Sequence, residues 1–303
     1  RENQPDFTVY PFQTTVSMDT LFFDQKKEVL TQIDFFRDKK SWYEQRGKPY
    51  TLGLCSYGIP GCGKTTFEKA VASYLNRHMI IVDFSKIKTS QEADQIFFSE
   101  TINDLHIPYE KRLYVFPDID RMCDLITGQK KTSDKIDPNM ITPELLMSLK
   151  NMTDKDHHPN SENFSLRKNS NESKEHSFSL SKLLNILDGI PERTGQVIMM
   201  SANHPEKIDH ALLRPGRIDI LLEFKPARLQ DLFSIVYQQF DINLDRIDQQ
   251  PIERYQSLDR KWTPAEIFQI CSRYYSITNP KEAINQVLNN LMTLSPEQVR
   301  NPF

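Results

Sequence analysis

The sequence has no apolar stretch of about 18 residues, the length that a membrane-spanning helix requires. Its N-terminus also lacks the basic and apolar regions of a signal peptide. We therefore expect the chain as given to be soluble and to contact a membrane only through a segment outside it. The first residue is arginine and not methionine, which favours an excised or processed piece of a longer protein.

Cysteine is scarce, and neither sign of charge is in large excess. The chain has four cysteines, with no C-x-x-C pair and no nearby histidine at metal-binding spacing. This indicates neither a zinc site nor a disulfide framework, and it favours a reducing intracellular compartment, cytoplasmic or mitochondrial. The formal net charge is only −3, so nucleic acid is an unlikely partner. The cysteines are Cys55, Cys62, Cys123 and Cys271.

Five short apolar runs predict buried strands, and helical patterns separate most of them. This alternation is typical of an α/β fold with a five-stranded, mainly parallel sheet flanked by helices. From residue 228 onward only helical patterns occur, which predicts a C-terminal all-helical subdomain. The predicted strands are Thr51 to Tyr57, His78 to Phe84, Arg112 to Phe116, Gln196 to Ala202, and Asp219 to Phe224.

These patterns divide the chain into three parts. Residues 1–18 form an irregular lead-in, residues 19–227 the α/β domain and residues 228–303 a helical lid. Asp19 and Thr20 are predicted to cap the first helix, and Thr263 and Glu266 to form a capping box in the lid. A polar tract at about 124–176, with a helical candidate at Thr142 to Leu149, is predicted to be a partly disordered surface insertion.

One motif carries clear chemistry. The residues from Gly58 to Thr65 match G-x-x-x-x-G-K-[ST], with a predicted strand before them and a helix after them. The glycines let backbone N–H groups surround phosphate oxygens, Lys64 is placed to reach the β and γ phosphates, and the Thr65 hydroxyl is the expected Mg²⁺ ligand. This predicts a P-loop NTPase that binds ATP and Mg²⁺ through Gly58, Ile59, Pro60, Gly61, Cys62, Gly63, Lys64, Thr65 and Thr66.

Beyond this loop, from about Asp19 to Leu291, the chain resembles the AAA ATPases. It is most similar to the branch that contains the mitochondrial chaperone that translocates the folded Rieske iron–sulfur protein during assembly of complex III. The residues that carry the resemblance are Trp42-Tyr43, Arg46-Gly47, Pro49-Tyr50, Tyr57-Gly58, Pro60 to Lys64, Leu183 to Gly189, Ser201 to His204, and Ala211 to Asp219.

The resemblance implies roles for three further residues. Asn203 matches sensor 1, a polar side chain that orients the attacking water near the γ-phosphate. Arg214 and Arg217 match the arginine fingers, which reach into the nucleotide site of a neighbouring subunit and stabilise developing charge. The implied assembly is a ring of identical subunits, and the implied partner is a protein client.

The chain departs from the family pattern after the third strand. The family has two successive acidic residues there, but the alignment of Ile119-Asp120 puts Pro117 at the magnesium side and Asp118 at the catalytic position. Asp118 either acts as catalytic base with a shorter reach than glutamate, giving slow turnover, or serves as a metal ligand and leaves the water poorly activated.

Two other departures concern the partner and the lid. The segment from Ser85 to Ser90 has no aromatic residue where threading motors place one in the pore, and the lid has no arginine between Trp262 and Glu266. Arg260 or Arg273 could take the place of this missing lid arginine.

The favoured function is an ATPase that remodels or translocates a protein. The alternatives are an assembly scaffold with little or no hydrolysis, supported by Pro117, and a nucleic-acid motor.

Overall fold

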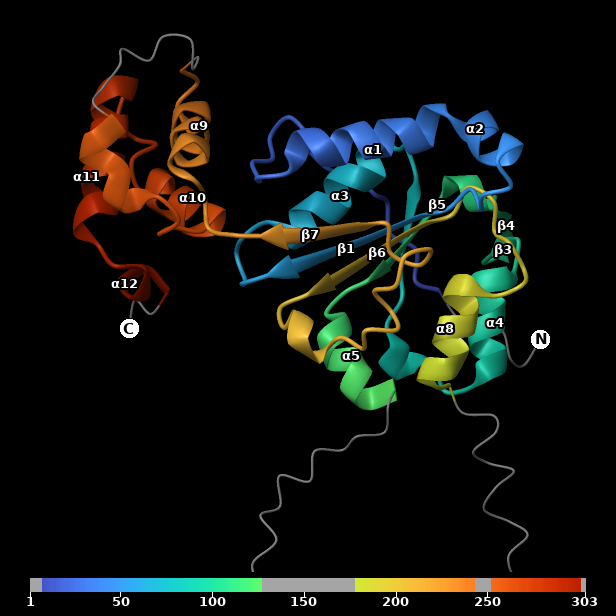
Figure 1. Cartoon of the computed structure of the whole chain (residues 1–303). Coiled ribbons are helices and arrows are strands. Elements are labelled where there is room, and N and C mark those ends of the chain that lie inside the picture. The colour runs from blue at the N-terminus through green and yellow to red at the C-terminus, as the bar shows by residue number, and fades with distance from the viewer. Residues whose placement is uncertain (1–6, 127–177, 243–251, 301–303) are drawn as a thin grey trace, which may run out of the picture.

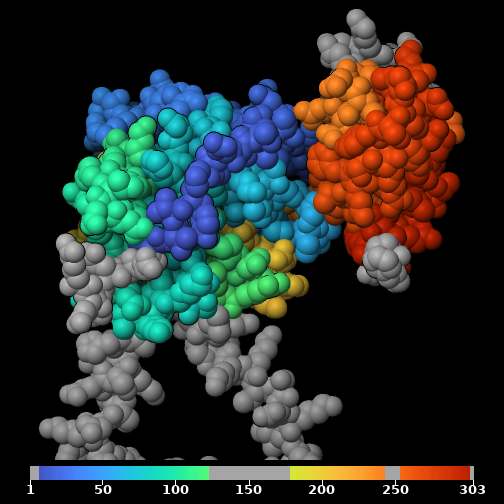
Figure 2. All heavy atoms as spheres, turned by 180° about the vertical axis from the view of Figure 1, so that it is seen from behind, coloured from blue at the N-terminus to red at the C-terminus, as the bar shows by residue number. Residues whose placement is uncertain are grey.

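A computed structural model describes residues 7–126, 178–242 and 252–300. They form an α/β domain and a helical lid, which appear as two adjoining lobes in Figures 1 and 2. No helix in these ranges is long and apolar enough to cross a membrane. The helical candidate at Thr142 to Leu149 and most of the predicted insertion lie outside the described residues.

A five-stranded parallel sheet forms the centre of the α/β domain. Its strand order is β2-β5-β6-β1-β7. All five predicted strands are confirmed, although the second ends at Ile81 and not at Phe84, where a 3-10 turn, η1 (Phe84–Lys86), begins. The strands are β1 (Leu52–Gly58), β2 (His78–Ile81), β5 (Arg112–Phe116), β6 (Val197–Ala202) and β7 (Ile220–Phe224).

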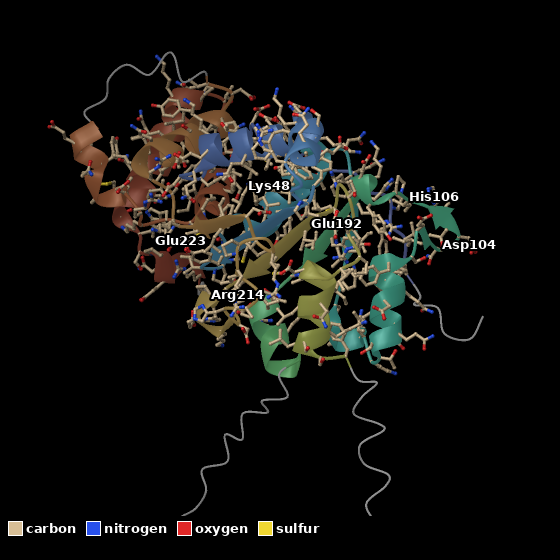
Figure 3. All side chains as sticks on the ribbon, turned by 45° about the vertical axis from the view of Figure 1, so that its right-hand side comes forward. Lys48, Asp104, His106, Glu192, Arg214 and Glu223 are labelled. Carbon is tan, nitrogen blue, oxygen red and sulfur yellow. The ribbon has the colours of Figure 1, made fainter. Side chains whose placement is uncertain are left out.

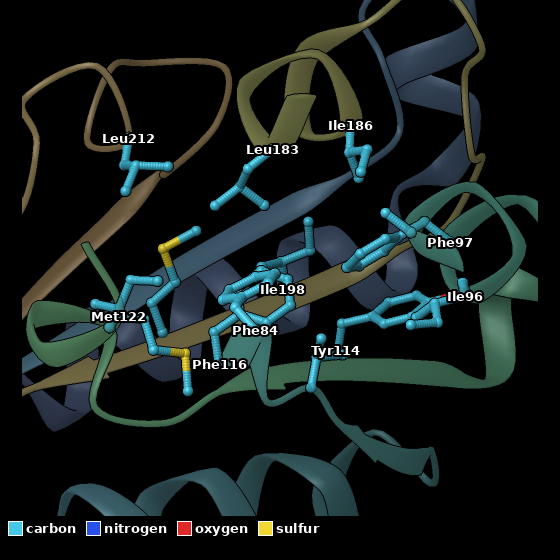
Figure 4. Close-up of a cluster of buried hydrophobic side chains, with 14 of the residues drawn as sticks. Phe84, Ile96, Phe97, Tyr114, Phe116, Met122, Leu183, Ile186, Ile198 and Leu212 are labelled. Carbon is cyan, nitrogen blue, oxygen red and sulfur yellow. The ribbon is translucent and has the colours of Figure 1, made fainter. Parts of the chain in front are cut away.

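Helices cover both faces of this sheet (Figure 1). One face packs against α1 (Lys26–Asp38) and α3 (Lys64–Tyr74). The other packs against α4 (Ser90–Phe98), α5 (Ile119–Ile126) and α8 (Leu180–Asp188), and Figure 4 shows the apolar side chains between them. The central strands read as continuous apolar runs because both of their faces are buried.

Smaller elements complete the domain. Helix α2 (Lys40–Gln45) follows α1, and a two-stranded antiparallel hairpin, absent from the sequence prediction, consists of β3 (Thr101–Ile102) and β4 (Leu105–His106). Two 3-10 turns, η2 (Tyr109–Lys111) and η4 (Pro205–Lys207), lie before β5 and after β6.

Two sequence expectations about element ends were wrong. Asp19 and Thr20 do not cap the first helix, because α1 begins at Lys26 and the Thr20 hydroxyl instead donates to the Ser17 carbonyl at 3.0 Å. The insertion does not begin at Asp124, because α5 continues through Ile126. Before α1, Phe23 packs against Phe67 and Phe224, which keeps the residues that precede Lys26 out of the helix.

The lid consists of α9 (Leu229–Gln239), η6 (Ile252–Leu258), α10 (Pro264–Ser272), α11 (Pro280–Thr293) and α12 (Pro296–Arg300). It has its own apolar core around the fully buried Trp262. The predicted capping box of α10 is confirmed, since Thr263 accepts from the Glu266 N–H and Glu266 accepts from the Thr263 N–H. Figure 1 places the lid beyond the carboxyl ends of β1 and β7.

Candidate nucleotide site

The glycine-rich loop joins the carboxyl end of β1 to the first turn of α3. Gly58, Gly61 and Gly63 have φ values of 135°, 85° and 104°, a region that side-chain-bearing residues rarely adopt. A Cβ atom on Gly58 would lie 2.1 Å from the Phe224 carbonyl oxygen. Both the backbone conformation and the packing therefore require glycine, and the loop can wrap its N–H groups around an anion at a helix N-terminus.

Lys64 is the first residue of α3, and its side chain is held inside the loop. Its Nζ donates to the Gly58 carbonyl at 2.6 Å and to the Ile59 carbonyl at 3.1 Å. Burial lowers the pKa of Lys64, and the nearby carboxylates of Asp118, Asp120 and Glu68 act in the opposite direction. The ammonium group thus lies among the backbone groups that would surround phosphate, with acidic side chains near it.

Asp118 and Asn203 meet at the same edge of the sheet. Asp118 follows β5 with a left-handed φ of 48°, and Asn203 follows β6, the strand between β5 and β1. The Asn203 Nδ2 donates to Asp118 Oδ1 at 3.1 Å, and Arg121 lies 3.9 Å from the same carboxylate. An uncommon backbone conformation at Asp118 turns its side chain toward the neighbour that the resemblance names as sensor 1.

Two buried acids in this region were not predicted as site residues. Asp120 is fully buried and accepts from the His204 N–H at 3.1 Å, so it ties α5 to the segment after Asn203. Glu68, in α3, is 3% exposed, and burial raises its pKa. A sequence signal existed for Glu68, because it interrupts the apolar face of α3 that includes Phe67 and Val71.

The two arginines predicted as fingers have different environments. Arg214 is exposed on the segment leading to β7 (Figure 3), and its side chain makes no hydrogen bond or ion pair with any residue that the structure describes. Arg217 is 14% exposed; its guanidinium lies 3.6 Å from Asp188 and also donates to the Ala211 carbonyl. Thus Arg214 is available to a neighbouring molecule, whereas Arg217 is bound within its own subunit.

The lid touches the phosphate loop directly. The Gly61 carbonyl accepts a hydrogen bond from the N–H of Ala265, in the first turn of α10, at 3.2 Å. A Cβ atom on Gly61 would lie 3.2 Å from the Thr263 hydroxyl. The loop therefore lies between the sheet and the N-terminus of α10.

Two arginines also fix the lid near its connection to the sheet. Arg260 binds Asp24 and the Pro226 carbonyl, and Arg228 binds Asp24 at 3.0 Å. Arg260 is one of the two residues that could replace the missing lid arginine. Arg273 is exposed at the far end of α10. Arg260 is thus held by the segment before α1.

A separate hollow of about 330 Å³ lies at the opposite end of β1 from the phosphate loop. Leu52, Asp188, Arg193 and Arg217 contribute to its lining. Its position away from Lys64 and Asp118 separates it from the nucleotide site.

ATP and Mg²⁺ fit the donor groups that are present. The loop offers backbone N–H groups and a lysine for phosphates, and Thr65, exposed in the first turn of α3, and Asp118 offer the oxygen ligands that Mg²⁺ prefers. Within the described residues, no cluster of three or more His, Cys, Asp or Glu side chains could hold a metal by itself. A magnesium ion here would depend on phosphate oxygens and water for the rest of its coordination.

A parallel sheet with this loop after β1, a carboxylate after β5 and a polar side chain after the intervening β6 defines a P-loop nucleotide-binding protein. A profile of the ATPase family associated with various cellular activities (AAA) matches residues 54–163 and 160–226. The chain belongs to this family.

Curated relatives agree with this assignment. AAA-ATPase At5g40000 of Arabidopsis thaliana is 29% identical over 245 residues, which are 80% of this chain and 44% of the relative. The probable mitochondrial chaperone BCS1-A of Dictyostelium discoideum is 28% identical over 268 residues, 87% of this chain and 52% of the relative. The probable mitochondrial chaperone BCS1-B of the same organism is 28% identical over 272 residues, which are 88% of this chain and 53% of the relative. The chain spans about half the length of the curated relatives it matches.

Proposed function

We propose that this chain is the ATP-hydrolysing subunit of an oligomeric ring that remodels or translocates a protein partner. The observation that carries the proposal is the arrangement at one sheet edge: Lys64 inside the glycine loop, and the Asp118–Asn203 pair beside it. Arg214 is exposed, and its side chain makes no hydrogen bond or ion pair with the described residues, so it is available to a neighbouring copy. A complete site would then need two subunits.

Each residue has a defined part in the proposed reaction. Lys64 and the loop N–H groups would bind the triphosphate, and Thr65 would hold Mg²⁺, which would neutralise charge on the phosphate oxygens. Asn203 orients both the Asp118 carboxylate and the attacking water. Asp118 accepts the proton of that water, and its shorter side chain predicts slow turnover. Arg214 of an adjacent subunit stabilises charge on the transferred phosphoryl group.

The segment after β2 favours a folded protein as the partner. Phe84, the aromatic residue nearest to the predicted pore position, is 4% exposed and packs against Phe116 at a ring distance of 4.9 Å. It cannot grip an extended chain from that position. Two relatives bear names as probable mitochondrial chaperones, in keeping with a protein client and with a reducing compartment, cytoplasmic or mitochondrial.

The decisive experiment measures particle mass with and without a non-hydrolysable ATP analogue, together with phosphate release. We expect assembly with the analogue, and hydrolysis that Lys64→Ala abolishes. Lys48→Ala, a change at an exposed lysine outside the glycine loop, is the matched control and should assemble normally. A folded protein that stays monomeric and binds no nucleotide at any magnesium concentration contradicts the proposal.

Pro117 supports one second candidate, a nucleotide-gated scaffold that assembles but hardly hydrolyses ATP. Proline supplies no carboxylate at the magnesium side of the site. The same measurements separate the two functions, because a scaffold would assemble with the analogue and release phosphate no faster than Lys64→Ala.

A further inference from the structure

The position of Pro117 within the sheet identifies where a carboxylate is missing. Phe116 of β5 is paired with Met200 of β6, so the next residues, Pro117 and Ser201, lie side by side. Ser201 is also the register partner of Ser56 in β1, the strand that leads to the glycine loop. The position of Pro117, which supplies no carboxylate, therefore adjoins Ser201, between Asp118 and the phosphate loop.

Glu68 reaches this place from the other side. It belongs to α3, and burial raises the pKa of its carboxyl, while the neighbouring Ser201 hydroxyl acts in the opposite direction; Lys64 and Asp118 are among its charged neighbours. Glu68 also follows Thr65 by three residues in the same helix, a spacing that puts two side chains on adjacent turns of one face. An acid from α3 thus lies beside the position where β5 has none.

The Glu68 carboxylate has an unused oxygen. The side chain is 3% exposed, and Oε1 has no hydrogen-bond partner. Burying an unpaired carboxylate oxygen costs free energy, so a helix that needed only packing here would carry an apolar residue, as it does at Ala70 and Val71. The free oxygen is a ligand or acceptor position at the edge of the nucleotide site.

We infer that Glu68 supplies, from α3, the magnesium-side carboxylate that Pro117 does not provide on β5. This inference rests on the proposed function, because it concerns the same nucleotide site. Glu68 is a positioning residue: its carboxylate lies near Ser201, and Oε1, which has no hydrogen-bond partner, would accept a hydrogen bond from water bound to the metal. The acidic pair of the site is then split between α3 and β5, with Glu68 on the magnesium side and Asp118 on the water side.

The test uses Mn²⁺ in place of Mg²⁺ and measures its binding to the protein with a non-hydrolysable ATP analogue by electron paramagnetic resonance. Glu68→Gln keeps the shape of the side chain and its place near Ser201, but it removes the anionic oxygen. We expect Mn²⁺ to bind about tenfold more weakly or worse, the usual effect of losing a group that orients a metal's ligands. Glu253→Gln, at an exposed site in the lid, is the matched control.

A second change asks whether the two positions are equivalent. Pro117→Asp in the Glu68→Gln background should restore most of the lost Mn²⁺ affinity, because it returns a carboxylate to the place beside Ser201. Unchanged Mn²⁺ affinity in Glu68→Gln, or no recovery in the double variant, overturns the inference and leaves Glu68 as a buried acid that only supports Ser201.

Two controls keep the outcomes distinct. Binding of the analogue in EDTA tests the phosphate loop alone and should be equal in all variants; its absence from the wild-type protein would contradict the proposed function itself. If Glu68→Gln does not fold, the Mn²⁺ affinity of Pro117→Asp in the wild-type background tests the inference instead. With Glu68 present we expect less than a threefold change in Mn²⁺ affinity, and a tenfold increase would mean that the site lacked a carboxylate.

Discussion

Arg214 and Arg217 are three residues apart, but Arg214 makes no hydrogen bond or ion pair with the described residues, whereas Arg217 is bound to Asp188 and to the Ala211 carbonyl. We therefore assign the proposed action between subunits to Arg214. Arg214→Ala should lower turnover by about 10³-fold, the lower end of the usual effect of removing an arginine finger, and should leave nucleotide binding intact. Phosphate release and analogue affinity measure the two effects. Loss of binding would assign Arg214 to the fold of its own subunit.

Mixing two inactive variants tests whether the arginine acts on a neighbour. Arg214→Ala subunits have an intact loop, and Lys64→Ala subunits have an intact Arg214, so mixed assemblies contain some complete sites. We expect part of the activity to return on mixing. An arginine that acted within its own subunit would give no recovery.

Arg217 has a different predicted effect because it is bound to Asp188 and to the Ala211 carbonyl. Arg217→Ala should lower the free energy of unfolding by about 1–2 kcal/mol, mostly through the lost hydrogen bond, since Asp188 is largely exposed and its ion pair is screened by water. Urea denaturation measures this loss. Arg214→Ala serves as the control and should be close to wild type in stability.

Two buried thiols predict how stability depends on pH. Burial raises the pKa of Cys55 and of Cys271 from 9.0 to about 12. The folded protein keeps these protons at pH values where the unfolded chain loses them, so their stabilising effect is complete below about pH 9 and falls as the pH rises toward 12. Each thiol contributes a loss of about 1.4 kcal/mol per pH unit in that window.

Urea unfolding between pH 8 and pH 10.5 measures this slope. Cys55→Ala and Cys271→Ala should each reduce the slope of unfolding free energy against pH by the contribution of one thiol, even though each variant is less stable at pH 8. An unaltered slope in both variants would place the proton release on other groups.

Some residues of the candidate site could be predicted from the sequence, and others could not. The glycine loop was predictable because all of its functional parts are consecutive from Gly58 to Thr65. Glu68 could have been noticed as a charge on the apolar face of α3, but its role could not be predicted, because that role depends on Ser201 and Pro117, which lie far along the chain. The inward turn of Arg217 depends in the same way on Asp188.

Among the elements, α10 joins the lid to the phosphate loop, and its capping box stabilises the end that makes the contact. Thr263→Ala should reduce the stability of the lid by about 1 kcal/mol, because the Glu266 N–H loses its acceptor. Thr293→Ala, which removes a hydroxyl from the exposed end of α11, is the matched control. Hydrogen exchange of α10 amides measures the difference, and equal exchange in the two variants would contradict the role of the cap.

Element types were predictable where a local pattern was strong. The five strands follow apolar runs that need burial on both faces, and α10 follows a capping box that the sequence shows directly. The start of α1 was not predictable, because Phe23 packs among Phe67 and Phe224 and Asp24 binds the lid arginines, which keeps those residues out of the helix. The β3–β4 hairpin has two residues per strand, too few to give a periodic signal.

For the whole molecule, nucleotide binding should stabilise both lobes, because the phosphate loop contacts both. An ATP analogue at about 100 times its Kd should raise the free energy of unfolding by about 2.7 kcal/mol, and Lys64→Ala should remove most of this gain. Hydrogen exchange should slow in α10 as well as in α3. Protection confined to α3 would show that the lid does not respond to the nucleotide.

The hydrogen bond from Ala265 to the Gly61 carbonyl has a mechanical consequence. The loop that would receive the phosphates also supports the second lobe, because the first turn of α10 is bound to it. A change in the backbone of this loop during the proposed hydrolysis of ATP would therefore also displace α10 and, with it, the lid.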